Sequence, residues 1–100
     1  MQSNATVSQI TYQDCADYLR LTELTQGDIG TLTQMISIAR DYIRNWTGRT
    51  DEQIDEYRDF VIVLFVLVQD MWDNRTMYVD SENLNHVVSS ILDMHSVNLL

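Results

Sequence analysis

The chain has 100 residues, with 15 acidic and 6 basic side chains and a formal net charge of −9. This acidity argues against a nucleic-acid-binding protein, because such proteins neutralise phosphates with Lys and Arg, and against binding to an anionic membrane. The length allows one domain, spanning residues 1–100. With no Pro and only 3 Gly, the composition favours a few long helices joined by short turns. No signal peptide is evident in residues 1–10, so we expect an intracellular protein.

Residues 1–10 are polar and unpatterned, and we expect them to form a flexible tail or extended arm. Thr11 with Asp14 matches a capping box that opens a short helix ending near Arg20. The apolar face of this helix consists of Tyr12, Cys15, Ala16 and Leu19. Cys15 is the single cysteine, so it has no disulfide partner within the chain, and its place on the apolar face predicts a buried, inert thiol.

A second helix is predicted to start near Asp28, with Thr25 or Asp28 itself as its cap, and to stop at Thr47 and Gly48. Its core positions follow the spacing 3-4-3-4-3, which is typical of a core-facing stripe; they are Ile29, Leu32, Ile36, Ala39, Ile43 and Trp46. Gly48 is placed to adopt the left-handed conformation that ends helices.

Nine consecutive apolar residues, 60–68, dominate the middle of the chain. The run is too short to span a bilayer, which takes about 20 apolar residues. No Gly or Pro interrupts residues 51–75, so we predict one long helix that starts in the acidic cluster after residue 50 and ends near residues 73–75. Phe60, Leu64 and Val68 should form its buried centre. We expect its neighbours to leave part of it, around Ile62 and Val66, uncovered near a subunit interface.

A fourth helix is predicted to start at a Ser81 cap and to end before a tail of residues 96–100. Its core face should consist of Leu84, Val87, Val88, Ile91 and Leu92. The predicted fold is therefore all-α: a small four-helix bundle around a long buried central helix, with its core at residues 11–95 and flexible N- and C-terminal tails.

The sequence offers no catalytic, cofactor or metal site. His86 and His95 are nine residues apart on one helix and point to opposite sides, so they cannot ligate one metal together. The acidic residues lie on helices without the central Gly of a calcium loop. Neither a Gly-rich phosphate loop nor a Ser/His/Asp arrangement is present. We therefore expect a protein that is not an enzyme.

Two groups of aromatic and Arg residues remain. Residues 41–49 read Asp-Tyr-Ile-Arg-Asn-Trp-Thr-Gly-Arg, and residues 72–75 read Trp-Asp-Asn-Arg. We expect Trp46 and Trp72 to pack on the core. For Tyr42, Arg49 and Arg75, a role in an interface is the alternative to packing or loop bracing, because Tyr, Trp and Arg dominate interaction hot spots.

These two runs, with a buried helix before the second and a short helix after it, resemble the small all-helical head–tail connector proteins of tailed bacteriophages, also called head-completion or adaptor proteins. The resemblance covers residues 11–95. It departs from the family in the junction 78–81, where many members carry Pro, and in residues 26–30, where the usual acidic turn is reduced.

The resemblance implies a structural virion protein at the head–tail interface, made in the host bacterial cytoplasm. Such proteins assemble as a ring, typically of twelve subunits, beneath the portal protein. The ring extends the DNA channel without sequence-specific binding and offers a surface to tail, stopper or second connector proteins. No catalysis, cofactor or membrane is implied. We expect the C-terminal residues Asn98, Leu99 and Leu100 to dock on the portal or on an adjacent subunit.

Two other readings remain open. One is an acidic DNA mimic that inhibits a nucleic-acid-binding protein, which the net charge permits and which predicts strongly salt-dependent binding to basic proteins. The other is a general interaction module.

Overall fold

The computed structural model describes residues 5–97, and within them all regular structure is helical. The α-helices are α1 (Tyr12–Leu19), α2 (Gln26–Thr47), α3 (Asp51–Ile54), α4 (Asp59–Asn74) and α5 (His86–Met94). Two 3-10 helices, η1 (Val7–Gln9) and η2 (Ser81–Asn83), precede α1 and α5. The prediction of a small all-α bundle is confirmed.

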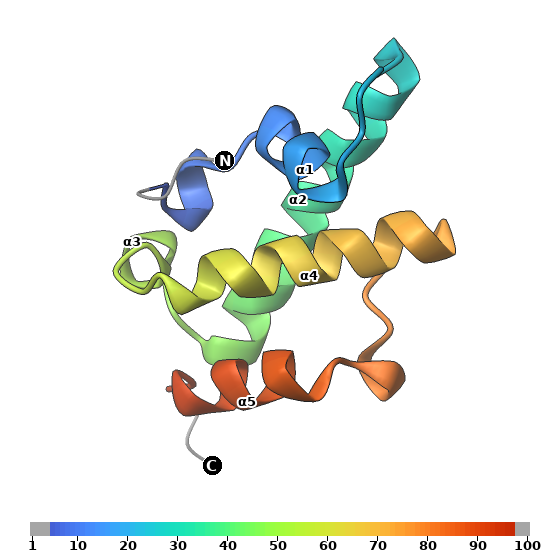
Figure 1. The fold of residues 1–100 in the computed structure, drawn as a ribbon. Helices are drawn as coiled ribbons and strands as arrows, with labels where there is room; N and C mark the ends of the chain where they lie inside the picture. Colours follow the sequence, from blue (N-terminus) through green and yellow to red (C-terminus); the bar gives the residue numbers. More distant parts are fainter. Residues whose placement is uncertain (1–4, 98–100) are drawn as a thin grey trace.

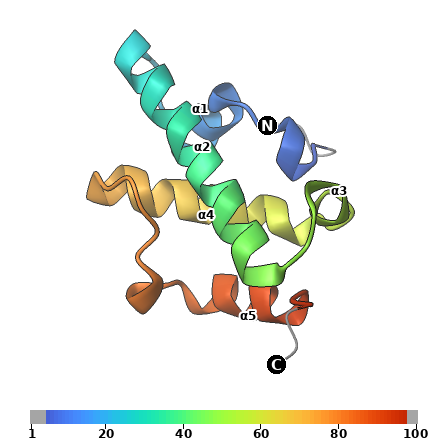
Figure 2. The same cartoon turned by 180° about the vertical axis from the view of Figure 1, so that it is seen from behind.

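Helix α4 lies at the centre of the fold, as its apolar run predicts. In Figure 1, α1 and η1 lie on one side of α4 and α5 on the other, while α2 crosses behind it; Figure 2 shows that crossing from the opposite side. Phe60, Leu64 and Val68 have no exposed surface. A helix with apolar residues on nearly every side needs neighbours on nearly every side, and α4 packs against α1, α2, α5 and η1.

Local chemistry sets the starts of α1 and α2. The backbone N–H of Asp14 donates to the Thr11 hydroxyl (3.4 Å), and the Asp14 carboxylate accepts from the Thr11 N–H (2.9 Å). Thr25 and Asp28 form the same reciprocal pair at 3.1 Å each. Thr25 is therefore the cap of α2, which begins two residues before Asp28.

The prediction of one long third helix is wrong, because the chain turns between Ile54 and Asp59. A capping box between Thr50 and Gln53 starts α3, and the Tyr57 N–H then donates to the Ile54 carbonyl (3.1 Å) in the turn. A continuous helix would hold acids at i,i+4 through residues 51–59, each pair repelling by a few tenths of a kcal/mol. The turn also lets Ile54 become buried beside η1.

Of the two alternatives predicted for the N-terminal segment, a flexible tail or an extended arm, the flexible tail is wrong for residues 5–10. Residues 5–10 pack on the bundle, with Ala5, Val7 and Ile10 buried. Isolated apolar residues in a polar context carry no periodic signal, so the sequence did not reveal this packing. We call residues 5–10 the N-terminal arm.

The last helix begins later than predicted. Asp80 caps η2, and the Asn85 side-chain carbonyl accepts from the backbone N–H groups of Val87 (2.8 Å) and Val88 (3.4 Å), so Asn85 rather than Ser81 caps α5. Val88 faces the core, whereas Val87 is 61% exposed, contrary to its predicted core position.

Candidate functional site

The motif of residues 41–49 forms the end of α2 and the exit from it. Gly48 has φ 72°, the predicted left-handed conformation, and its N–H donates to the Arg44 carbonyl (2.8 Å). The buried Thr47 hydroxyl donates to the Ile43 carbonyl (2.8 Å) and accepts from the Arg49 N–H (3.2 Å). The run Thr-Gly-Arg therefore has a local structural role, because it ends α2 and turns the chain toward α3.

Arg49 is half-buried and braces the C-terminal segment. Its Nε donates to the His95 carbonyl (2.5 Å), and its guanidinium lies 5.1 Å from the centre of the Tyr57 ring. Nearby, the Val97 N–H donates to the Thr47 carbonyl (2.7 Å). Of the two roles considered for Arg49, these contacts favour bracing.

The His95 imidazole fills the space between this brace and α4. Its Nε2 lies 3.2 Å from Asp59 Oδ2, and its ring centre is 4.3 Å from that of Tyr57 and 5.0 Å from that of Phe60. His86, at the other end of α5, is exposed. Within residues 5–97, no three His, Cys, Asp or Glu side chains converge as metal ligands.

Tyr42 and Trp46 pack together on the α5 side of α2. Their ring centres are 5.8 Å apart, and the indole N–H of Trp46 donates to Asp93 Oδ1 (2.8 Å). Both side chains are half-buried against the core, as predicted for Trp46, and burial raises the pKa of Tyr42. Because Tyr42 is only half-buried, part of its side chain remains exposed and a partner can contact it.

The second motif forms the end of α4. Trp72 packs against the core, as predicted, and the Arg75 guanidinium lies 4.6 Å from the centre of its ring. Arg75 has φ 55°, a left-handed conformation usually taken by Gly, and the next N–H, of Thr76, donates to the Met71 carbonyl (3.0 Å). Arg75 is exposed. A partner can therefore reach this arginine.

A pocket of about 130 Å³ lies between the end of α4 and the loop that leads to α5. Its lining combines apolar side chains such as Leu67 and Leu84 with the polar Asp70 and Asn74. Desolvation, and secondly the charge of Asp73, raises the pKa of Asp70. The pocket is smaller than the 300–1,000 Å³ typical of ligand sites.

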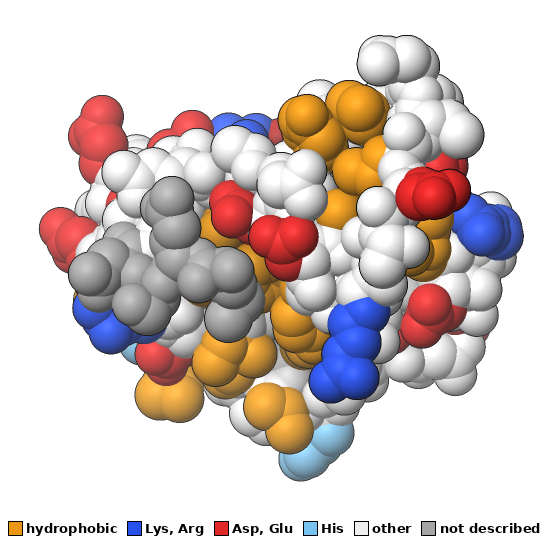
Figure 3. All heavy atoms as spheres, turned by 45° about the horizontal axis from the view of Figure 1, so that its top comes forward, with side chains coloured by type: hydrophobic (Ala, Val, Ile, Leu, Met, Phe, Trp, Pro, Cys, Tyr) orange, Lys and Arg blue, Asp and Glu red, His pale blue; other side chains and the backbone are white. Residues whose placement is uncertain are grey.

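Apolar side chains also reach the surface away from the motifs. Ile62 on α4 is 57% exposed, and Val66 on the next turn is half-buried, as predicted for this part of α4. On α5, Val87 and Met94 are exposed. In Figure 3, hydrophobic side chains reach the surface in several groups, with acidic side chains between them.

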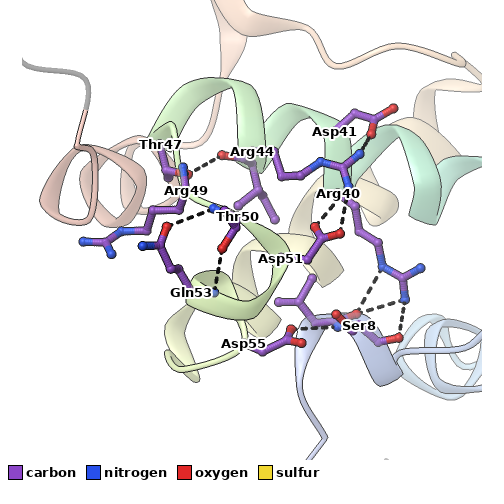
Figure 4. A network of polar contacts seen from close by, with 12 residues as sticks. Ser8, Arg40, Asp41, Arg44, Thr47, Arg49, Thr50, Asp51, Gln53 and Asp55 are labelled. Atoms are coloured by element: carbon purple, nitrogen blue, oxygen red, sulfur yellow. Dashed lines mark hydrogen bonds and ion pairs between the residues drawn. The ribbon is translucent and has the colours of Figure 1, made fainter.

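The sequence did not reveal a polar network that joins α2, α3 and the N-terminal arm (Figure 4). Arg44 pairs with Asp41 and with Asp51 (3.0 Å to Oδ1), and the Ser8 N–H donates to Asp55 Oδ1 (3.0 Å). Arg40 reaches from α2 to the carbonyls of the arm.

Cys15 has no exposed surface, as predicted, and burial raises the pKa of its thiol to about 12. A thiol that stays protonated is a poor nucleophile. Asn98, Leu99 and Leu100, the predicted docking residues, lie outside the described part of the chain.

Comparisons with protein-family models, with curated proteins and with solved structures find no match to this chain. In the described residues, no helix combines the length and apolar character needed to cross a bilayer.

Proposed function

We propose that this chain is a head–tail connector of a tailed bacteriophage, which assembles as a ring beneath the portal protein in the virion. The observation that carries the proposal is the paired occurrence of the runs 41–49 and 72–75 in one small all-helical chain. The two runs end α2 and α4, the two longest helices, which pack against each other. The proposal assigns the chain no catalysis and no cofactor.

The distribution of apolar surface supports assembly into a ring. A ring is built from heterologous contacts, in which one patch of each subunit meets a different patch of the next. Within residues 5–97, large exposed apolar side chains occur on several elements; they are Tyr18 on α1, Ile62 on α4, Met77 and Tyr78 in the loop after α4, Val87 and Met94 on α5, and Val97 after it. Exposed apolar residues on both α4 and α5 provide two different surfaces for a heterologous contact.

The net charge of −9 supports a role around DNA in transit. Like charges repel, so an acidic wall keeps a duplex mobile and does not hold its phosphates. At least three of the six arginines are engaged with carbonyls or carboxylates of the same chain; these include Arg40, Arg44 and Arg49. These arginines are correspondingly less available to phosphates.

Electron microscopy of the purified chain, alone and mixed with a portal protein encoded in the same genome, tests the proposal. We expect ring-shaped particles that join the portal. Ile62→Asp should prevent the rings, whereas Ser37→Asp, at an exposed polar position of α2, should leave them intact. A chain that stays monomeric with the portal present would refute the connector role.

The same experiment separates the connector from the acidic DNA mimic. A mimic should bind basic nucleic-acid-binding proteins without forming a ring, and its affinity should fall steeply with salt. Pull-down with such proteins at 50 mM and 300 mM salt, roughly spanning the range over which surface charges are screened, distinguishes the two.

A further inference from the structure

The N-terminal arm, residues 5–10, is bound to the bundle like a short peptide in a site. Ala5, Val7 and Ile10 are each at most 7% exposed. The arm lies against α3 and α4. We call the surface that holds it, formed by Arg40, by α3 with Asp55 directly after it, and by α4, the cradle.

The cradle recognises mainly the backbone of the arm. The Arg40 guanidinium donates to the carbonyls of Val7 (2.9 Å from Nη2 and 3.2 Å from Nε), Ser8 (3.1 Å) and Ile10 (2.8 Å). On the other side, Asp55 accepts from the Ser8 N–H at 3.0 Å. Figure 4 shows Arg40 and Asp55 converging on Ser8 from α2 and from the turn after α3. These groups would bind the same segment equally well from another chain.

The arm has its own local shape. The Thr6 N–H donates to Gln9 Oε1 (3.0 Å), and the Gln9 N–H donates to the Thr6 carbonyl (3.0 Å). Ile10 and Thr11 are extended, and α1 then starts with a separate capping box. The arm can therefore move as a unit about residues 10–11 without unwinding α1.

We propose that in the assembled ring the arm of each subunit occupies the cradle of the next copy, so that the contact within one chain is exchanged for the same contact between chains. Exchange of an identical element is a low-cost route to assembly, because bonds lost in one chain are remade in another. Because residues 5–10 keep their contacts with a cradle in either arrangement, the exchange requires the start of α1 in one subunit to lie beside the cradle of the next.

The exchange rests on the proposed ring, because a ring raises the local concentration of a neighbour's cradle. An arm and a cradle on every subunit also form a heterologous pair, which closes a ring without a symmetric contact. In an isolated chain the linked arm outcompetes arms from other molecules, so exchange should appear only under assembly conditions.

Cysteine cross-linking between two differently tagged chains tests the exchange. One chain carries Ser8→Cys in the arm and the other carries Asp55→Cys in the cradle. Under assembly conditions, a short bismaleimide should cross-link the two chains into a mixed dimer. The control replaces the Asp55→Cys chain with a Glu82→Cys chain, whose cysteine lies on η2, and it should give at most one tenth of that yield. The buried Cys15 makes the unmodified chain a silent control. Adding Arg40→Ala to the Asp55→Cys chain should remove the mixed dimer.

A chain with both Ser8→Cys and Asp55→Cys shows whether the two positions can be linked at all, since it should cross-link internally as a monomer. If this chain links and rings form without mixed dimers, arm exchange is wrong and the connector proposal stands. Mixed dimers without rings would support exchange and contradict the ring. If neither forms with the portal present, both proposals fail.

Discussion

Two residues of α4 that lie two positions apart should lose very different amounts of stability on truncation to Ala. Leu64 has no exposed surface, so Leu64→Ala removes fully buried methyl groups and leaves a cavity, at a cost of about 2–5 kcal/mol. Fully burying an Ile side chain stabilises a protein by about 2–3 kcal/mol. Ile62 is 57% exposed, so its truncation should remove less than half of that stabilisation. Part of that loss is offset because Ala favours a helix by a few tenths of a kcal/mol more than Ile. We expect Ile62→Ala to cost about 0.5 kcal/mol.

Thermal unfolding of the monomer, followed by circular dichroism, measures this difference. At roughly 4–8 °C per kcal/mol for a domain of this size, a cost of about 3 kcal/mol for Leu64→Ala lowers Tm by about 12–24 °C, whereas Ile62→Ala lowers it by only about 2–4 °C. Urea titration at one temperature provides an independent value. Equal losses in the two variants would refute the assignment of Ile62 to an uncovered face of α4.

Three further predictions concern the exit of α2 and the buried thiol. Gly48→Ala should cost about 1–2 kcal/mol in urea unfolding, because a Cβ is disfavoured at φ 72°; an unchanged midpoint would contradict this. Arg49→Ala should cost about 1–3 kcal/mol, through loss of the bond to the His95 carbonyl and of the contact with Tyr57, and Arg49→Lys should restore less than half. Full recovery by Lys would show that charge alone matters. The folded pKa of Cys15, about 12, exceeds its ordinary value of 9.0, so the folded state keeps a proton that the unfolded state loses. This contribution to stability should be complete below pH 9 and lost between about pH 9 and 12; Cys15→Ala, compared by urea unfolding across that range, should lack this loss.

The sequence by itself determined the helical class and several helix boundaries. A capping box acts over three residues, so Thr11 with Asp14 predicted the start of α1, and Thr25, one of the two predicted caps of α2, starts that helix. Gly48 ended α2 as predicted, since a left-handed residue is a local requirement. The buried centre of α4 also followed from sequence, because a continuous apolar run must be covered.

The tertiary structure alone decided features that depend on distant partners. The chain turns after α3, where Asp55 meets Ser8 from the other end of the sequence. The N-terminal arm is ordered by Arg40, 33 residues away from Val7. The two motif arginines differ for the same reason: the half-buried Arg49 contacts the His95 carbonyl and the Tyr57 ring, while Arg75 is exposed beside Trp72. Local spacing predicts which residues cap a helix, whereas the partner of a long polar side chain depends on how the helices pack.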